Sequence, residues 1–147
     1  MLRELSRREI PAVAVNRRTA DVTNVADARR ALAGADVVYH AANAAYATWP
    51  RTLPPIMDGL VGALSGTSTR LVYGDNLYAY GRVTGPITES TPERASSPNE
   101  LVRKRLAEQV LQAHGVIGRS SDFIGAGVTQ SIFGERAIGP ALAGKPA

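Results

Sequence analysis

Short apolar runs alternate with amphipathic segments along the chain. Four runs have the length and composition of buried strands, and they cover residues 12–15, 35–43, 70–73 and 116–119. Segments with helical spacing of apolar residues predict helices over residues 1–9, 27–32 and 56–64. Strands that alternate with helices at this spacing predict a mostly parallel, doubly wound sheet.

One further helix has the strongest local signals, and it is expected to begin at Ser97. Ser97 is an N-cap residue, Pro98 suits the first helical position, and Glu100 completes a capping box. Apolar residues then repeat at four-residue spacing, at Val102, Leu106 and Val110. Gly115 is expected to end the helix, because glycine readily adopts the left-handed conformation found after helix C-termini.

The segment from residue 74 to residue 97 is rich in Gly, Pro, Ser and Thr and predicts one long loop. Loops of this length in compact domains are usually functional. The preceding strand is expected to end at Gly74-Asp75-Asn76, and so to deliver polar groups to the carboxyl edge of the sheet. Open α/β sheets bind their ligands at that edge.

Composition narrows the class of protein. The chain has 147 residues, the length of one domain, and its net charge of +4 invites a nucleic-acid interpretation. The arginines are scattered among acids, however, and no zinc-finger or RNA-recognition motif is present, so no nucleic-acid partner is expected.

No apolar run approaches the roughly 20 residues of a membrane span, so no membrane partner is expected. Without cysteines there are no disulfides, and a cytoplasmic location is predicted.

Three stretches together resemble the extended short-chain dehydrogenase/reductase family, the NAD(P)-dependent epimerases and dehydratases. They are RLVYGDNLYAYG at 70–81, the helix with Lys104 and Glu108, and GRSSDFIGAG at 118–127. The resemblance implies an incomplete Rossmann-like doubly wound parallel sheet. The family's first βα unit with its G-x-x-G-x-x-G loop is not found in the sequence, and the similarity stops at 139–147, before most of the substrate domain. Residues 128–147 would begin a truncated substrate-binding region, and a fragment of a longer protein is expected.

The resemblance assigns cofactor contacts to two places. Arg17 and Arg18 follow the predicted strand 12–15, where arginine pairs with the 2′-phosphate of NADP, so NADP is expected and NAD is the other option. Two exposed surface arginines are an equally good interpretation. Asp21 and Val22 match the turn that borders adenine, although Asp21 could equally be an ordinary turn residue.

The second group of cofactor contacts lies at the end of the 35–43 segment, where the strand runs into a small-residue turn formed by His40, Ala41, Ala42 and Asn43. The small alanines suit a close approach of the cofactor to the backbone. His40 itself is more often a buried histidine with satisfied hydrogen bonds than a catalyst.

The family's catalytic positions are only partly matched. Its Ser or Thr falls on Asn76 and its lysine on Lys104, so Asn76 is expected to bind a substrate carbonyl and Lys104 the nicotinamide ribose. Its tyrosine falls on Glu100, whose reference pKa of about 4.3, against about 10 for tyrosine, makes it a poor substitute as a proton donor. The capping box explains Glu100 structurally. Tyr78 and Tyr80 are candidates for a relocated acid, and each could equally serve loop packing.

The motif after the last strand implies a substrate pocket, with Arg119, Asp122 and Phe123 as its contacts, beside Gly125 and Gly127. The expected function is that of an epimerase/dehydratase-like or reductase-like protein acting on a small carbonyl or sugar-like substrate, inactive as this fragment. The alternatives are a non-catalytic NADP-binding sensor module and a non-functional truncated product. A homodimer remains open.

Overall fold

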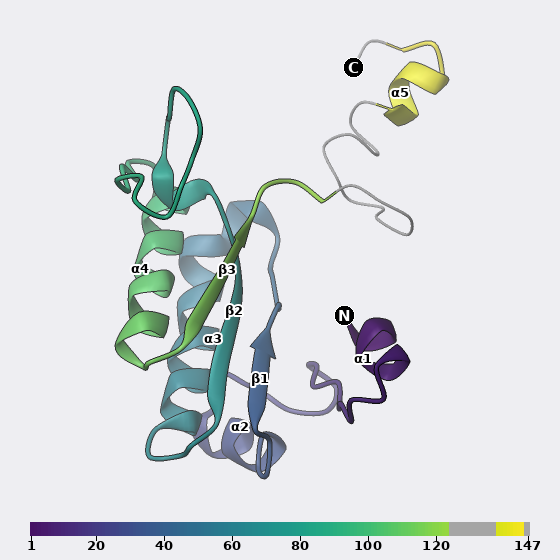
Figure 1. Ribbon diagram of the computed structural model, residues 1–147, viewed down its shortest axis with the longest axis vertical. Coiled ribbons are helices and arrows are strands. Elements are labelled where there is room, and N and C mark those ends of the chain that lie inside the picture. The colour runs from purple at the N-terminus through teal and green to yellow at the C-terminus, as the bar shows by residue number, and fades with distance from the viewer. Residues whose placement is uncertain (124–137, 146–147) are drawn as a thin grey trace.

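A computed structural model describes residues 1–123 and 138–145 of the chain. Its helices are α1 (Leu2–Arg7), α2 (Val25–Ala31), α3 (Trp49–Leu64), α4 (Pro98–Gln112) and α5 (Gly139–Leu142), and its strands are β1 (Val37–His40), β2 (Arg70–Asn76) and β3 (Val116–Ser120). Two 3₁₀ turns, η1 (Tyr46–Thr48) and η2 (Tyr78–Tyr80), follow β1 and β2. The strands form one parallel sheet in the order β1-β2-β3, with α3 and α4 on one of its faces (Figure 1). This is the incomplete Rossmann-like sheet that the sequence predicts.

The register of the sheet brings the carboxyl ends of its strands together. His40 at the end of β1 pairs with Tyr73 of β2, and two residues further along β2, Asp75 pairs with Arg119 of β3. Residues that lie far apart in the sequence therefore meet at one edge of the sheet.

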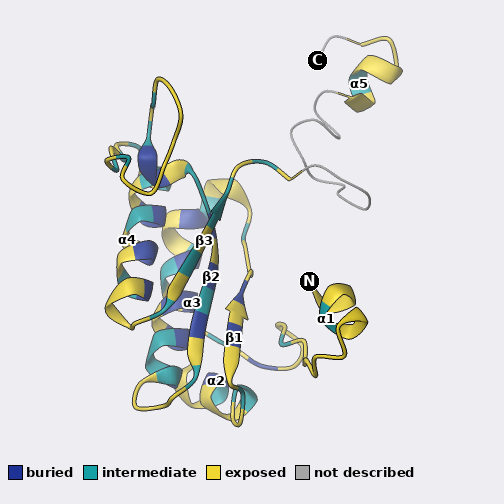
Figure 2. Cartoon of the chain, in the orientation of Figure 1, coloured by how far each residue is buried: buried dark blue, intermediate teal, exposed yellow. Residues whose placement is uncertain are grey.

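The core lies between the sheet and the two long helices, because alternate strand residues point to opposite faces. Its buried cluster consists of Val38, Trp49, Leu53, Met57, Leu71, Tyr73, Val102, Leu106 and Val110. The opposite face is open, with the side chains of Val37 and Tyr39 41% and 50% exposed (Figure 2).

Helix α3 begins earlier than the sequence predicts, at Trp49, and continues through Pro54 and Pro55. A proline inside a helix costs about 3 kcal/mol, because it removes one hydrogen bond and crowds the preceding turn. The early start is nevertheless favoured, because it buries Trp49 and Leu53 in the core at 5% and 2% exposure. No helix in the described part of the chain, α3 included, is long and apolar enough to cross a membrane.

The strand predicted over residues 12–15 is wrong. These residues form no regular structure, and Val13 is 88% exposed. In a Rossmann fold this segment pairs with a first strand, and in residues 1–123 and 138–145 the sheet contains only β1, β2 and β3. Helix α1 likewise buries none of its residues and stands apart from the sheet (Figure 1).

Strand β2 is longer than predicted, and the loop after it is shorter. Gly74, Asp75 and Asn76 do not start a loop, because they pair with Gly118, Arg119 and Ser120 of β3. The 3₁₀ turn η2 follows directly. Of the loop predicted over 74–97, only Leu77 and residues 81–97 lack regular structure.

Helix α4 begins as the sequence predicts and ends differently. The Ser97 hydroxyl accepts a hydrogen bond from the Glu100 N–H, and the Glu100 carboxylate accepts one from the Ser97 N–H at 3.0 Å. The left-handed residue at the other end is His114, with φ of 55°, and not Gly115. Glycine at 115 is explained by close packing instead, because a Cβ there would lie 2.9 Å from the carbonyl oxygen of Leu71.

Candidate functional site

A carboxylate lies on the buried face of the central strand. Leu71, Tyr73 and Asp75 alternate along β2 and point toward the helices, so Asp75 is only 4% exposed. A buried carboxylate is costly unless cations and hydrogen-bond donors compensate its charge. The residues around Asp75 provide that compensation.

Arg103 on α4 is the first cation beside Asp75. It is 4% exposed, and its Nη1 lies 3.7 Å from Asp75 Oδ1 and donates a 2.7 Å hydrogen bond to the Tyr73 hydroxyl. Nη2 donates to the side-chain oxygen of Asn43 at 3.0 Å, and the guanidinium lies 4.0 Å from the centre of the Trp49 ring. One side chain thus connects α4, β2, the start of α3 and the segment after β1.

Arg119 at the end of β3 is the second cation. Its Nε donates to Asp75 Oδ2 at 3.2 Å, and its Nη2 donates to the carboxylate of Glu93. The same guanidinium lies 4.8 Å from the centre of the Tyr80 ring. Arg119 therefore holds both the 3₁₀ turn η2 and the 81–97 loop against the end of β3.

Burial is the main cause of the shifted pKa values of Asp75, Tyr73 and His40. It raises the pKa of Asp75, an effect that the Asn76 backbone N–H, Arg103 and Arg119 oppose. It raises the pKa of Tyr73 to about 12, so the phenol stays protonated near neutral pH. His40 stacks on Tyr73 with 5.2 Å between ring centres, and burial together with the Arg103 charge lowers its pKa to about 4. His40 is therefore neutral at pH 7, as expected of a packed histidine.

The solvent-accessible residues at the carboxyl edge of the sheet are small or polar. Ala41 and Ala42, which follow β1, are exposed. Asn76 at the end of β2 is half-exposed, and its Oδ1 accepts a hydrogen bond from the Tyr78 N–H at 3.1 Å. Its Nδ2 has no partner within the described residues. The edge thus offers room for a ligand and one hydrogen-bond donor.

Of the residues predicted to contact a cofactor, His40 ends β1 and Ala41, Ala42 and Asn43 follow it directly, at the same edge of the sheet as the end of β2. Arg17 and Arg18 instead lie in an exposed turn, which is closed by a 2.9 Å hydrogen bond from the Arg18 N–H to the Asn16 side chain.

In the turn predicted to border adenine, Asp21 and Val22 both make contacts within the protein that explain these residues structurally. Asp21 Oδ1 accepts hydrogen bonds from the N–H and hydroxyl of Thr23, at 3.0 and 2.7 Å. These bonds lower the pKa of Asp21. Val22 packs its backbone against Gly59 of α3, where a Cβ would lie 2.0 Å from the Val22 carbonyl oxygen. The ordinary turn interpretation of Asp21 therefore has direct support.

Glu100 and Lys104, at the positions of the family's tyrosine and lysine, both lie on α4. Glu100 is occupied by the cap of α4, and the backbone N–H groups of Ser97 and Ser96 lower its pKa. Lys104 is half-buried, and its side chain makes no hydrogen bond or ion pair within residues 1–123 and 138–145.

The two candidate tyrosines differ in access. Tyr80 is only 6% exposed and lies against Arg119. Tyr78 is 39% exposed and packs against Tyr46 and Trp49, with ring centres 5.8 and 5.4 Å away. Of these two, Tyr78 is the one that a ligand at the edge could reach.

The predicted substrate contacts are only partly described. Arg119 is occupied by Asp75 and Glu93, Asp122 is half-buried and Phe123 is 65% exposed. Gly125 and Gly127, and most of the predicted region 128–147, lie outside the described residues. Arg119 therefore serves to hold the edge together in this structure.

Four residues of the cluster were not predicted as site residues: Tyr73, Asp75, Glu93 and Arg103. A signal for two of them is present in the sequence. Asp75 continues the alternation of Leu71 and Tyr73, and Arg103 adjoins Val102 on the buried stripe of α4. Glu93 carries no such signal, because its contact with Arg119 depends on the path of the loop.

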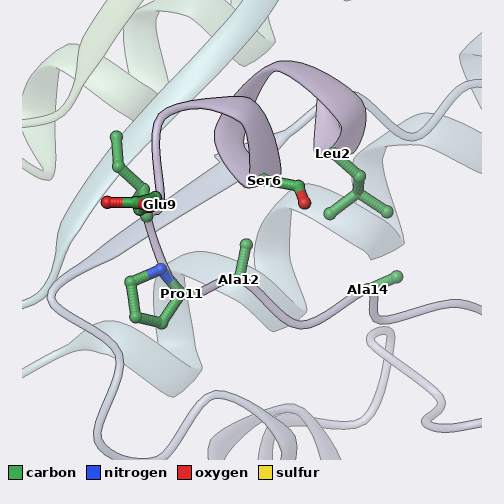
Figure 3. A pocket seen from close by; sticks show the side chains of 7 residues that line it. Leu2, Ser6, Glu9, Pro11, Ala12 and Ala14 are labelled. Carbon is green, nitrogen blue, oxygen red and sulfur yellow. The ribbon is translucent and has the colours of Figure 1, made fainter.

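A further hollow of the described structure lies away from this edge. It measures about 450 Å³ and is formed by α1 and the segment that follows it (Figure 3). Its lining consists of Leu2, Ser6, Glu9, Ile10, Pro11, Ala12 and Ala14. None of these is a strand-end residue, so this hollow is not part of the candidate site.

Comparison with known proteins identifies the fold. No protein-family model and no curated protein matches the sequence. Among solved structures, a dTDP-4-dehydrorhamnose reductase from Clostridium acetobutylicum matches with a TM-score of 0.74 at 16% identity, over 86% of this chain and 50% of that one. A UDP-glucuronic acid 4-epimerase from Bacillus cereus, solved with NAD, gives 0.69 at 20%, over 86% and 45%. A GDP-D-glycero-L-gluco-heptose synthase from Campylobacter jejuni, solved in the presence of NADPH, gives 0.73 at 14%, over 95% and 48%.

The chain spans about half the length of these enzymes. Identities of this size establish the fold alone. By fold, the chain is a partial Rossmann-like domain of the kind found in the NAD(P)-dependent short-chain epimerases and reductases.

Proposed function

We propose that this chain is part of an NAD(P)-dependent epimerase or reductase that acts on a small carbonyl or sugar-like substrate. The observation that carries the proposal is the carboxyl edge of the sheet, where exposed Ala41 and Ala42 follow β1 and the half-exposed Asn76 ends the neighbouring strand β2. Ligands of open parallel sheets bind at this edge. Structural neighbours with the same fold were solved with NAD or NADPH, which supports a nicotinamide dinucleotide as the ligand.

The residues present fit part of such a cofactor. Ala41 and Ala42 leave space for a close approach to the backbone. The side chains of Arg17 and Arg18 are exposed, form no ion pair within residues 1–123 and 138–145, and suit the 2′-phosphate of NADP. The sequence has no glycine-rich loop for the pyrophosphate, so that portion would need another surface. When bound, the cofactor would supply hydride chemistry at a carbonyl carbon.

The chain's own residues take the following roles in the proposal. Asn76 Nδ2 donates a hydrogen bond to the substrate carbonyl oxygen, since its Oδ1 is already occupied by the Tyr78 N–H. Tyr78, which is 39% exposed in the same turn, holds at its hydroxyl the proton exchanged with the substrate. Arg119, whose guanidinium lies 4.8 Å from the centre of the Tyr80 ring, positions this turn, and Lys104 contacts the cofactor ribose.

A non-catalytic NADP-binding module is the second candidate. The specific observation that favours it is Glu100, which stands at the family's tyrosine position and is occupied by the helix cap. Such a module would bind the cofactor through the same edge without turnover.

Calorimetric titration of the chain with NADPH and NADH tests the proposal, after circular dichroism confirms that the chain is folded. Ala42→Trp should abolish binding, because Ala42 is exposed and the new ring would fill the edge. Ala113→Trp, exposed beyond the far end of α4, is the matched control and should bind like the wild type. A folded wild-type chain that binds neither cofactor would contradict both candidate functions, and a chain that does not fold would favour a non-functional truncated product.

Binding by wild type with loss in Ala42→Trp would justify assays of carbonyl reduction and epimerisation. In those assays Tyr78→Phe separates the candidates. A loss of turnover with binding unchanged would support the enzyme, and binding without any turnover would support the binding module.

A further inference from the structure

Three aromatic rings come together in the segments that follow β1 and β2. Tyr46 belongs to η1 and Trp49 begins α3, and the centres of their rings are 5.0 Å apart. Tyr78 of η2 packs against both, with its ring centre 5.8 Å from that of Tyr46 and 5.4 Å from that of Trp49. Trp49 is buried, whereas Tyr46 is 53% exposed and Tyr78 is 39% exposed. The two tyrosine rings therefore present aromatic surface to solvent beside a buried tryptophan.

Contacts within the protein hold this aromatic cluster in place. The Trp49 indole N–H donates a 3.0 Å hydrogen bond to the Ala44 carbonyl oxygen, and the Arg103 guanidinium lies 4.0 Å from the centre of the indole ring. The Asn99 side chain donates a 3.0 Å hydrogen bond to the carbonyl oxygen of Tyr46. Both Arg103 and Asn99 belong to α4, so a long helix fixes the segment that carries Tyr46. A surface that is already ordered loses little conformational entropy when a ligand binds.

The side chains around Tyr46 favour an aromatic ring over a sugar ring. Five alanines precede α3, and they are Ala41, Ala42, Ala44, Ala45 and Ala47. The polar side chains of this segment are engaged within the protein, because Asn43 Oδ1 accepts a hydrogen bond from Arg103 and the Thr48 hydroxyl donates one to a backbone carbonyl. The hydroxyls of a sugar ring need several hydrogen-bond partners, whereas a planar aromatic ring needs apolar and stacking contacts.

The aromatic surface adjoins the group that the proposed function assigns to the substrate carbonyl. The Tyr78 N–H donates a 3.1 Å hydrogen bond to Asn76 Oδ1, and the Tyr78 ring packs against Tyr46. A ring that stacks on Tyr46 therefore lies one side chain away from the amide of Asn76. An aromatic ring with a carbonyl substituent matches this pairing of an aromatic surface with a hydrogen-bond donor.

From this geometry we propose that Tyr46 and Tyr78 bind the ring of the substrate, and that the substrate is a small compound whose carbonyl carbon is attached to an aromatic ring. This assignment rests on the proposed function and deepens it, because it gives the small carbonyl substrate a chemical class. Tyr46 is then a residue that determines specificity, and it takes no part in proton transfer.

A ¹⁵N NMR titration of the full chain with acetophenone, compared with its saturated analogue cyclohexyl methyl ketone, tests this assignment. Trp49 is the only tryptophan of the chain, so its indole N–H gives a single reporter signal within the aromatic cluster. Acetophenone should shift this signal and the amides of residues 45–47 and 76–79. It should bind about two- to tenfold more tightly than the saturated ketone, which is the range expected for one stacking contact between aromatic rings.

Variants of Tyr46 test whether its ring carries the preference. Tyr46→Leu keeps an apolar side chain without a ring and should abolish the preference for acetophenone, whereas Tyr46→Phe should retain it. Both variants should stay folded by circular dichroism, because more than half of Tyr46 is exposed. Tyr39→Leu is the matched control. It removes a tyrosine that is 50% exposed on the open face of the sheet, and should leave the preference unchanged.

Several results would overturn the aromatic class. These are the absence of saturable binding of acetophenone, equal affinities for the two ketones, or an equal loss of preference in Tyr39→Leu and Tyr46→Leu. Tighter binding of methyl glucoside at the same amides would assign the surface to a sugar ring instead.

A parallel NADPH titration of the wild-type chain separates this assignment from the proposed function. Binding of NADPH without a preference for acetophenone would overturn the aromatic class and leave the proposed function standing. A preference for acetophenone without binding of NADPH would contradict the proposed function and support the ring-binding surface alone.

Discussion

Arg103 on α4 and Asp75 on β2 form a buried ion pair, with Nη1 and Oδ1 3.7 Å apart and both side chains 5% exposed or less. The strand alternation places a carboxylate in the layer between sheet and helices, and α4 supplies the compensating cation from its own buried face. The same guanidinium binds Tyr73 and Asn43, so the pair sets the geometry of the carboxyl edge.

Removing Arg103 should destabilise the fold strongly. Arg103→Met leaves Asp75 with Arg119 alone and removes the bond to Tyr73, and breaking a buried pair in this way costs about 3–5 kcal/mol. Urea unfolding followed by circular dichroism measures the free energy of unfolding. Adding Asp75→Asn to Arg103→Met should recover part of the loss, because the uncompensated charge is then gone. Arg105→Met, exposed on the same helix, should stay within about 0.5 kcal/mol of wild type.

The stability of the chain should fall as the pH drops from about 6.5 toward 4. The pKa of His40 is lowered from 6.5 to about 4 in the folded state, so the unfolded chain binds the proton more tightly in this window. At about 1.4 kcal/mol per pKa unit, full protonation costs about 3 kcal/mol. His40→Phe keeps a ring against Tyr73 and should flatten the dependence of unfolding free energy on pH. His114→Asn, which removes the exposed histidine, should leave the dependence as steep as in wild type.

The capping box should matter for stability and not for binding. Ser97→Ala removes the acceptor for the Glu100 N–H and should cost about 0.5–2 kcal/mol. Glu100→Gln keeps an oxygen for the Ser97 N–H and should cost less. Cofactor affinity, measured by calorimetry, should be unchanged in Glu100→Gln. A selective loss of affinity in that variant would show that Glu100 acts at the site and that its structural explanation is incomplete.

Gly59→Ala should destabilise the chain although alanine normally favours helices. In an open helix the change gains about 1 kcal/mol. Here the new methyl group would lie 2.0 Å from the Val22 carbonyl oxygen, and overpacking of this kind costs about 1–3 kcal/mol. Gly62→Ala is the graded comparison, because its methyl group would meet only the Val25 side chain, at 2.9 Å. In thermal unfolding, the midpoint temperature of Gly59→Ala should lie well below that of Gly62→Ala.

The parts of the fold that sequence predicts well are those fixed by local chemistry. The capping box at Ser97 and Glu100 needs no distant partner, and the apolar run around Val38 forms a strand as expected. Elements that depend on tertiary packing were harder to predict. Residues 12–15 have the composition of a strand but pair with no strand in the described part of the chain. Helix α3 passes through Pro54 because Trp49 and Leu53 pack into the core.

The candidate site likewise contains features that the sequence predicts and contacts that depend on tertiary packing. The small-residue turn after β1 and the polar end of β2 are predictable from their places at strand ends. The family resemblance points to Lys104 and not to its neighbour Arg103, because it indicates a position in the sequence and not the direction of a side chain. Contacts such as that between Glu93 and Arg119 depend on the path of the loop and carry no periodic signal.

The most direct test of the account is a ¹⁵N NMR titration of the chain with NADPH. If the carboxyl edge is a nicotinamide dinucleotide site, the amides of Ala41, Ala42 and Asn76 should shift saturably, and Ala42→Trp should abolish the shifts. A folded chain in which these amides do not respond, or in which NADPH shifts only residues around the hollow at α1, would contradict the account.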